Sequence, residues 1–531
     1  MKWNILHIDE SRFSQKWGTG KLTSRLLAAS DLSDEQIAEL LRGDDHLKLS
    51  ESDCVQRACQ RILQARDNHE KVFVGGDYDC DGVCATAIMK ETLNTLGIEN
   101  GYYIPDRFKE GYGLHAETVQ MACDKGYSLI ITVDNGVKAH EALQKAKELG
   151  IDVIVTDHHV IEEDIEADIV VHPDYMEDDF AYLCGSGVAL ELSFNLIGMN
   201  HDNLIALAAV ASIGDVMPLW RETRRIVKRG LALLKQGIPF SLAQLLYPGA
   251  EVDETAVAFN IVPKLNSVGR MSDLGNVNTV PLYLITKDKE ASANYARQLN
   301  HINDVRKSLS ESESRIAENS LDEKDFQLIY QPDFHEGICG LVAGRIANKV
   351  HKPVLVMTDH DDLIKGSGRS VPGFNMFAFF SSFEETVSFG GHEMAVGISV
   401  YKKDYPLFQQ HIEEKIKQEN FVFQDEEEKA VAIHADDMTF DNIMDLKRLS
   451  PYPKELIKPY FAVYGGTIEN RRETAKTIKY EMHGDKGQYE ALLYKRKGLA
   501  EPKHPSCFIG TPGINRFRGH ITLQLIVEDI Q

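Results

Sequence analysis

The sequence lacks several features that would place it in a special class of protein. No apolar run approaches the roughly 20 residues that a membrane-spanning helix needs, so we expect no membrane contact. The eight cysteines form no CxxC pair, and the first residues carry early acids without a long apolar stretch. The net charge of −23 argues against a protein whose whole surface binds nucleic acid. These absences predict a cytoplasmic protein with reduced thiols and without a secretory signal.

The composition is that of an ordinary globular protein, and the pattern changes along the chain. With 531 residues, 43% of them hydrophobic, the chain is too long for a single core. A stretch without proline or glycine and rich in helix formers predicts one long connecting helix between two α/β patterns. Alternation of apolar and polar residues near the end predicts a domain of short strands. The boundaries we expect are 1–65 (helical), 66–284 (α/β), 285–322 (connecting helix), 323–425 (α/β) and 430–531 (all-β).

Four short apolar stretches between residues 72 and 174 each end in acids or histidines. They are VFVGGDYDCDG, LIITVDNG, DVIVTDHHV and DIVVHPD, and helical patterns separate them. Strands that alternate with helices predict βαβ units with a parallel sheet. Because the carboxyl ends of parallel strands meet at one edge, these polar residues are expected to gather there.

The first of these stretches contains three acids, Asp77, Asp79 and Asp81, within five residues. Carboxylates this close repel one another unless water or cations surround them. A calcium loop of the D-x-D-x-D-G type is the alternative. It requires a preceding helix and a Glu six residues after the glycine, whereas here a strand precedes and that position is Ile88. The pattern therefore favours a metal site at the end of a strand.

The later stretches add imidazoles and further acids. Asp157-His158-His159 follows an apolar strand, and successive side chains there point in different directions. One histidine can then bind a metal while the other reaches substrate, and Asp157 can orient an imidazole. The apolar segment LIALAAVASIGDV (204–216) predicts a buried helix that delivers Asp215 to the interior. Oxygen ligands with few imidazoles suit Mn²⁺ or Mg²⁺, and two ions that share a carboxylate are expected.

These motifs resemble those of the DHH phosphoesterase superfamily. DYDCDG, VDNG, TDHH and SIGDV match its four motifs, and IPDRFKEGYGL, PKLNSVGRM, HEGICGLVAGRIA, GSGRS and FGGHEMAVG are similar to the RecJ branch with its DHHA1 domain. The resemblance implies one Mn²⁺ held by Asp79, Asp134, His158 and Asp215. It implies a second held by Asp77 and Asp134, with His159 near both metal and scissile phosphate. In this family a histidine often stands two residues before the first aspartate, where this chain has Gly75.

The candidate site therefore has three parts, of which the substrate positions come from the resemblance. The metal ligands are Asp77, Asp79, Asp134, His158 and Asp215, and the catalytic residues are His159 and Asp157. The substrate-binding positions are Arg107, Asn266, Arg270, Arg345, Arg369, Gly391 and His392. For Arg107, Asn266 and Arg270, a surface or structural role is an equally good interpretation. Arg345 could be a core residue with an aliphatic stem, and the motif of Gly391 and His392 could be a simple Gly-Gly turn. Arg369 in GSGRS is more typical of a phosphate clamp.

The last hundred residues resemble the oligonucleotide-binding (OB) barrel that follows DHHA1 in RecJ proteins. From Lys447 to Gln531 there are 15 Lys and Arg against 9 Asp and Glu, although the chain as a whole is acidic. Aromatic residues lie among these cations, which suits a single strand whose bases stack. Alternation predicts that about half of the rings belong to the core. The residues concerned are Tyr460, Phe461, Tyr464, Tyr480, Tyr489, Tyr494, Arg471, Arg472, Lys476, Lys479, Lys495, Arg496 and Lys497.

The resemblance implies a metal-dependent exonuclease that degrades single-stranded DNA from 5′ to 3′ to mononucleotides in recombination and repair. The fold class we expect is α/β, with an all-β domain at the end. The protein would act as a monomer on single-stranded DNA, and a helicase or a single-strand-binding protein would be its partner. One alternative is a phosphodiesterase for short oligonucleotides or cyclic dinucleotides. A second is a catalytically silent adaptor, which the retained acids argue against.

Overall fold

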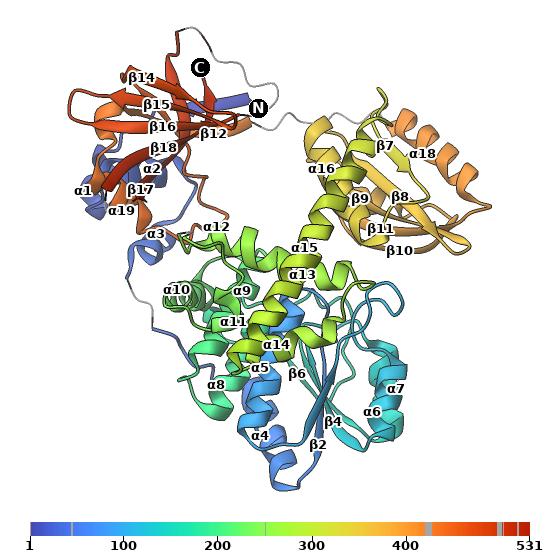
Figure 1. Ribbon diagram of the computed structural model, residues 1–531. Coiled ribbons are helices and arrows are strands. Elements are labelled where there is room, and N and C mark those ends of the chain that lie inside the picture. The colour runs from blue at the N-terminus through green and yellow to red at the C-terminus, as the bar shows by residue number, and fades with distance from the viewer. Residues whose placement is uncertain are drawn as a thin grey trace. The chain divides into compact units, whose positions relative to one another are not determined.

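A computed structural model describes residues 2–43, 46–249, 251–419, 427–495, 502, 504–517 and 520–531. The chain forms two compact units (Figure 1). The first unit comprises Met1–His46, Pro218–Arg225 and Glu426–Gln531, and the second comprises Leu47–Met217 and Ile226–Asp425. Residues from the two ends of the sequence thus belong to one unit.

The second unit begins with a five-stranded sheet whose strands are all parallel. Its order is β3-β2-β4-β5-β6. The first strand, β2, therefore has β3 on one side and β4, β5 and β6 in sequence on the other. Most strand residues are buried, as expected of a sheet covered on both faces. The strands are β2 (Lys71–Gly75), β3 (Asn100–Tyr103), β4 (Tyr127–Val133), β5 (Asp152–Thr156) and β6 (Ile169–Val171).

Helices cover both faces of this sheet. Helices α6 and α7 pack together on one face, and α4, α5, α8 and α9 pack on the other (Figure 1). The two helices α8 and α9 are apolar nearly all round, which explains why they lie in the interior. The helices of this part are α4 (Asp53–Asp67), α5 (Cys80–Thr95), α6 (Ala116–Asp124), α7 (His140–Leu149), α8 (Gly185–Ile197), α9 (Asp202–Gly214), α10 (Arg221–Lys235), α11 (Phe240–Ala243), α12 (Glu254–Ala256), α13 (Val262–Arg270) and α14 (Val280–Ile285).

A helix of 30 residues, α15 (Lys289–Glu318), connects this part to a second sheet. The side chain of Asp288 caps its N-terminus by accepting hydrogen bonds from the amides of Glu290 and Ala291. The second sheet has the order β10-β11-β9-β8-β7 and is antiparallel except for the pair β7 and β8. Its elements are β7 (Gln327–Tyr330), α16 (Glu336–Val350), β8 (Val354–His360), β9 (Leu363–Arg369), α17 (Met376–Phe380), β10 (Thr386–His392), β11 (Ala395–Tyr401) and α18 (Tyr405–Glu419).

The first unit contains an eight-stranded mixed sheet in the order β1-β12-β13-β17-β18-β16-β15-β14. Strand β1 pairs in parallel with β12, so the first strand of the chain completes a sheet made by the last hundred residues. The strands are β1 (Lys2–Leu6), β12 (Glu427–His434), β13 (Phe461–Tyr464), β14 (Thr467–Glu473), β15 (Thr477–His483), β16 (Gln488–Tyr494), β17 (Cys507–Phe517) and β18 (His520–Ile530). Its helices are α1 (Ser11–Trp17), α2 (Lys21–Ala29), α3 (Asp34–Leu41) and α19 (Phe440–Lys447).

The fold class predicted from the sequence is confirmed: a parallel α/β part, a long helix, a second α/β part and a C-terminal β-rich region. Strand β1 was not predicted, because the pattern of residues 1–65 is mostly helical. Among the described residues, no helix combines the length and the apolar character needed to cross a membrane.

Candidate active site

The first acids lie in the turn between β2 and α5. Asp79 caps α5, because its carboxylate accepts hydrogen bonds from the amides of Asp81 and Gly82 at 2.9 and 3.1 Å. Asp77 is buried, and its Oδ1 has no hydrogen-bond partner. A Cβ atom on Gly82 would lie 2.5 Å from the Asp77 carbonyl oxygen, so this tight turn requires glycine.

Asp134 follows β4 with its backbone in the left-handed region, at φ 62°. Aspartate tolerates this conformation better than most residues, but it remains unusual and typical of functional sites. Two hydrogen bonds hold the backbone there: the Asp134 amide donates to the carbonyl of Thr156 at 3.0 Å, and the Tyr112 hydroxyl donates to the Asp134 carbonyl at 2.7 Å. The conformation therefore fixes where the carboxylate of Asp134 lies.

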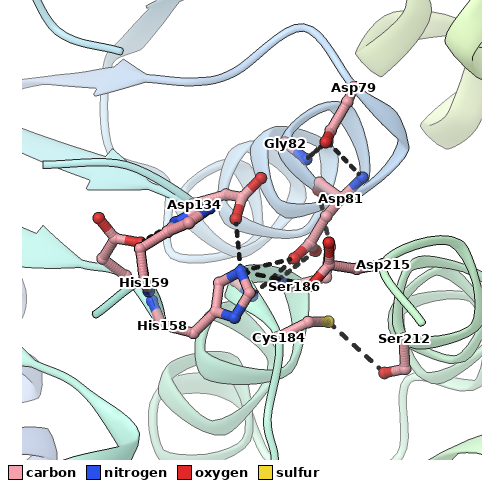
Figure 2. Close-up of polar contacts among 12 residues, drawn as sticks. Asp79, Asp81, Gly82, Asp134, His158, His159, Cys184, Ser186, Ser212 and Asp215 are labelled. Carbon is pink, nitrogen blue, oxygen red and sulfur yellow. Dashed lines mark hydrogen bonds and ion pairs between the residues drawn. The ribbon is translucent and has the colours of Figure 1, made fainter. Parts of the chain in front are cut away.

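His158 lies at the centre of the cluster and approaches acids from three different elements (Figure 2). Its Nε2 atom is 3.2 Å from Asp134 Oδ1, 3.5 Å from Asp215 Oδ2 and 3.8 Å from Asp81 Oδ2. Asp215 directly follows α9, as the sequence predicted for the end of this buried helix. Strand ends and a helix end distant in the sequence thus converge on one point.

Three overlapping groups of side chains could each hold a cation, since their ligand atoms lie within 4.8 Å of one another. They are Asp77 with Asp79 and Asp134; Asp134 with His158 and His159; and Asp81 with His158 and Asp215. Asp77 Oδ1, Asp134 Oδ1 and His158 Nε2 are all buried without a hydrogen-bond partner. Buried polar atoms are rarely left unsatisfied, so these donors fit a bound divalent cation. Asp134 belongs to two of the groups and can bridge two ions.

The acids repel one another in the absence of a cation. Burial and then the charge of Asp79 raise the pKa of Asp77 well above its ordinary value, and burial and then Asp81 raise that of Asp134. Burial, Asp81 and Asp79 together raise the pKa of Asp215 to about 7. Burial lowers the pKa of His158, which keeps the imidazole neutral, as metal binding requires. The centre is therefore strained electrostatically in a way that a divalent cation would relieve.

His159 is held in a different way from His158. Its Nδ1 lies 2.7 Å from Oδ1 of the fully buried Asp157. Since a carboxylate can only accept, Nδ1 carries the proton and Nε2 remains for another partner. Burial opposes the charged imidazole, but the hydrogen bond and the charge of Asp157 outweigh it and raise the pKa of His159. Asp157 also accepts from the amides of Val137, His158 and His159, so it is a rigid anchor.

A cleft of about 690 Å³ within the second unit lies beside this centre. Cations from three separate segments line it, and Arg107 lies over the ring of Tyr78 at 5.0 Å. The residues that line the cleft include Tyr78, Arg107, Tyr112, Arg270, Lys365, Ser367, Arg369 and Gly390.

The guanidinium groups of the cleft lie close enough to repel one another, and the charge of Asp79 only partly offsets this at Arg270. Burial, followed by the charges of Arg107, Arg369 and Arg306, lowers the pKa of Arg270 to about 10. Burial and Arg107 likewise lower the pKa of Arg369. Within the described part of the chain, neither arginine forms an ion pair with a carboxylate. Such a cluster attracts an anion, and guanidinium geometry matches phosphate.

The remaining predicted substrate-binding residues do not line the cleft. Arg345 is on the exposed side of α16, and Gly391 and His392 are exposed at the end of β10; none of the three lines the cleft. Asn266 uses its side-chain oxygen to accept a hydrogen bond from the Cys80 amide at 2.7 Å, which fixes the start of α5. The structure thus brings Arg107, Arg270 and Arg369 together and leaves these four outside the cleft.

Several of the cations predicted to bind a strand in the first unit form ion pairs with glutamates. Arg471 pairs with Glu473 at 2.7 Å, and Arg472 pairs with Glu481 at 3.1 Å. Tyr480 and Tyr489 are buried, whereas Tyr494 is 57% exposed. Arg496 and Lys497 lie outside the described residues. Phe461 is buried as well, so three of the six rings lie in the core and the expectation that about half of them do is confirmed.

Sequence reasoning missed Tyr112, Lys365 and Arg306. The Tyr112 hydroxyl lies 3.2 Å from His159 Nδ1, and Lys365 lines the cleft. Arg306, on α15, is close enough to Arg270 to affect its pKa. Tyr112 belongs to the stretch GYGL, whose likeness to RecJ was noted, but nothing in its own spacing marks it as part of the centre.

Comparison with known proteins supports this arrangement. Three family models match consecutive parts of the chain: the DHH family N-terminal domain at 71–213, the DHHA1 domain at 324–418 and the RecJ OB domain at 430–529. The chain is 29% identical to the single-stranded-DNA-specific exonuclease RecJ of Bacillus subtilis over its full length, covering 70% of that protein. It is 31% identical to the RecJ of Haemophilus influenzae over 67% of this chain and 68% of that protein.

A solved structure is similar along the whole chain. The crystal structure of RecJ in complex with Mn²⁺ from Thermus thermophilus matches with a TM-score of 0.83 and 25% identity, covering all of this chain and 79% of that one. The similar protein thus carries a metal of the kind that the acid and histidine cluster fits.

Proposed function

We propose, because the chain belongs to the RecJ family, that it is a metal-dependent exonuclease that degrades single-stranded DNA. The observation that carries the proposal is the cluster of buried, unpartnered ligand atoms beside a cleft lined by arginines. The first feature provides for hydrolysis and the second for recognition of phosphate. The relatives named above are single-stranded-DNA-specific exonucleases, which agrees with both features.

The metal centre is proposed to hold two Mn²⁺ or Mg²⁺ ions. Asp79, Asp134, His158 and Asp215 hold one, and Asp77 and Asp134 hold the other. Divalent ions in such a centre polarise the phosphoryl group and make water a stronger nucleophile. The overlap of the possible ligand groups at Asp134 supports two ions rather than one.

His159 is proposed to act on the phosphodiester directly. Its Nδ1 proton is committed to Asp157, and its raised pKa keeps the imidazolium form available near neutral pH. The free Nε2 can then donate a hydrogen bond to a phosphate oxygen or a proton to the departing oxygen. Tyr112 and Asp157 together prevent the ring from turning away.

The cleft is proposed to bind the 5′-terminal phosphate. Arg107, Arg270 and Arg369 form no ion pair with a carboxylate among the described residues. Glu336 also lines the cleft, but it pairs with Lys365 at 3.1 Å. A dianionic terminal phosphate would relieve the repulsion among the three guanidiniums. This supports digestion from the 5′ end with release of mononucleotides. We also propose that a longer strand contacts residues outside the cleft, namely Arg345, Asn266, Gly391 and His392.

The test is digestion of end-labelled oligonucleotides with Mn²⁺. Single strands with a 5′ phosphate should be degraded from that end, and duplexes should resist. Asp134→Ala should abolish the activity, while Asp174→Asn, an exposed acid just beyond β6, is the matched control that should retain it. Equal attack on duplex, or activity in Asp134→Ala, would contradict the proposal.

A phosphodiesterase for short oligonucleotides is a second candidate, because a cleft of about 690 Å³ accommodates only a few nucleotides. Deletion of 430–531 is not a clean test, since β12 pairs with β1 and Asp437 pairs with Lys21 and Arg25. Rates on dinucleotides and on long strands should be compared in the intact protein instead. Faster turnover of dinucleotides favours the second candidate.

The cellular context is also part of the proposal. We place the protein in the cytoplasm as a monomer that acts in recombination and repair, with a helicase or single-strand-binding protein supplying the strand. We propose that its functional parts follow the boundaries 1–65, 66–284, 285–322, 323–425 and 430–531, with 1–65 serving partly as a support for the last part. Strand β1 and the ion pairs of Lys21 and Arg25 with Asp437 support that connection.

A further inference from the structure

We propose that Asp81, the third acid of the first motif, is a positioning residue. It fixes the start of α8 against Asp134 and thereby sets the affinity of the centre for its cation, without serving as a ligand. The proposal rests on the metal centre of the proposed function and assigns this acid a task that none of the roles above includes.

Both oxygens of the Asp81 carboxylate are engaged with α8. Oδ2 accepts a hydrogen bond from the Gly185 amide at 2.7 Å, and Oδ1 accepts one from the Ser186 amide at 2.7 Å. The Ser186 hydroxyl returns a hydrogen bond to the Asp81 carbonyl at 2.9 Å. Asp81 is only 2% exposed, so these charge-assisted bonds are shielded from water and strong.

The anchored end of α8 touches Asp134 directly. A Cβ atom on Gly185 would lie 2.5 Å from Asp134 Cβ and 2.7 Å from Asp134 Cα. Only glycine allows this approach, and any shift of the first turn of α8 must therefore displace Asp134 or leave its backbone unsupported. Since Asp134 is already in the left-handed region, it depends on such packing to keep its conformation.

The alternative is that Asp81 is itself a ligand, since it can form a group with His158 and Asp215. The hydrogen bonds decide between the two roles. Asp77 Oδ1, Asp134 Oδ1 and His158 Nε2 are buried without partners, as vacant ligands would be. Asp81 has no vacant oxygen of this kind, because each of its two oxygens already accepts a short bond from a buried amide. Figure 2 shows the Asp81 side chain between His158 and the start of α8. From this position it can hold the start of α8 in place without binding the cation.

The experiment measures Mn²⁺ binding by calorimetry and the Mn²⁺ dependence of the rate in the full chain. Asp81→Asn keeps one acceptor and replaces the other by an amide group that opposes an N–H. Loss of such a supporting partner typically weakens metal binding by about 10- to 100-fold. We therefore expect a Mn²⁺ affinity at least about tenfold weaker, with kcat largely restored at saturating Mn²⁺. Asp174→Asn changes an exposed acid outside this network and is the control that should leave the affinity unchanged.

Asp77→Asn serves as the benchmark for loss of a ligand, because saturating Mn²⁺ should not restore its kcat. If Asp81→Asn behaves in the same way, Asp81 is a ligand and the proposal is wrong. If Asp81→Asn lowers the Tm but leaves the Mn²⁺ affinity unchanged, its role is only structural and the proposal is also wrong.

A second variant covers the case in which Asp81→Asn does not fold. Gly185→Ala keeps the acid but displaces the start of α8, because the added Cβ atom would lie 2.5 Å from Asp134 Cβ. It should weaken Mn²⁺ binding in the same direction, and an unchanged affinity would overturn the proposal. Because calorimetry needs no substrate, a wild-type protein that binds Mn²⁺ but cleaves no DNA would contradict the proposed function and still test Asp81.

Discussion

Two sheets of this protein differ in whether their polar side chains have partners. At the carboxyl edge of the parallel sheet in the second unit, ligand atoms of Asp77, Asp134 and His158 are buried without partners. In the eight-stranded sheet of the first unit, Arg471 and Arg472 are paired with glutamates. The first arrangement is unfavourable until a ligand arrives, whereas the second is already neutralised.

This difference shows which of two equally suggestive sequence patterns carries a preformed site. A run of acids after strands and a run of basic and aromatic residues both look functional in the sequence. Only the former gathers several unsatisfied buried ligand atoms at one point among the described residues, and such groups are rare unless a ligand completes them. Chemistry is therefore expected to depend steeply on the parallel sheet, and strand binding only modestly on single residues of the other.

Asp134→Ala should have the largest effect and tests whether the reaction depends on the parallel sheet. The variant removes the carboxylate that belongs to two ligand groups. Loss of several kcal/mol of transition-state stabilisation should lower the rate on single-stranded DNA by about 10³-fold or more. The rate with Mn²⁺ in a gel assay measures this, and an effect below about tenfold would place the reaction elsewhere.

Arg270→Ala should produce the next largest effect. Arg270 is crowded by other guanidiniums and has no carboxylate partner among the described residues. A hydrogen bond to a charged group contributes about 2 kcal/mol, which is about thirtyfold in kcat/KM. The loss should be confined to substrates with a 5′ phosphate, so 5′-hydroxyl strands are the internal control. Equal losses on both substrates would contradict phosphate recognition by this residue.

The Mn²⁺ affinity should depend on pH. Burial and the charges of Asp81 and Asp79 raise the pKa of Asp215 to about 7, so the metal-free protein holds a proton there that a cation must displace. Affinity should fall at least about tenfold from pH 8 to pH 6, and at least one proton should be released on binding near pH 6. Because the folded pKa is raised, the metal-free protein should also lose stability as pH rises through 7. Calorimetry in buffers of different ionisation enthalpy measures the release, and Asp215→Asn should reduce it by about one proton.

Tyr494→Ala tests the first unit. Tyr494 is 57% exposed, unlike Tyr480 and Tyr489, so it is the ring of these three that can stack on a base. Loss of one stacked base at about 1 kcal/mol should weaken single-strand binding by about fivefold. Fluorescence anisotropy with a labelled strand measures this, and cleavage of dinucleotides should be unaffected.

Tyr489→Phe is the matched change with the smallest expected effect. The Tyr489 hydroxyl is buried without a hydrogen-bond partner, so its removal relieves an unsatisfied group. Strand binding should be unchanged and the Tm equal or slightly higher. A clear loss of strand affinity in this variant would mean that the buried rings do contact DNA.

Much of the metal centre could be predicted because it depends on local patterns. Apolar runs that end in acids place Asp77, Asp134 and His158 at one edge of a parallel sheet by topology alone. The apolar character of α9 on all sides likewise places Asp215, which follows the helix, half-buried beside His158. These features do not depend on details of distant packing, so a single sequence suffices to predict them.

The remainder depends on contacts between distant segments, which no local pattern specifies. Strand β1 is short, and its partner β12 lies at the other end of the sequence. The engagement of Asp81 with α8 and the hydrogen bond from Tyr112 to Asp134 likewise become visible only in three dimensions. For the same reason the sequence allowed Arg345 to be a core residue with a buried aliphatic stem, although it is exposed on α16 and only Arg369 of the two lines the cleft.

Anomalous diffraction from crystals soaked in Mn²⁺ tests the central claim most directly. The account predicts two Mn²⁺ peaks separated by roughly 3.5–4 Å, bridged by Asp134, with His158 and Asp215 on one ion and Asp77 on the other. The Asp81 carboxylate should remain bonded to Gly185 and Ser186. Absence of any peak among these side chains at saturating Mn²⁺ would contradict it.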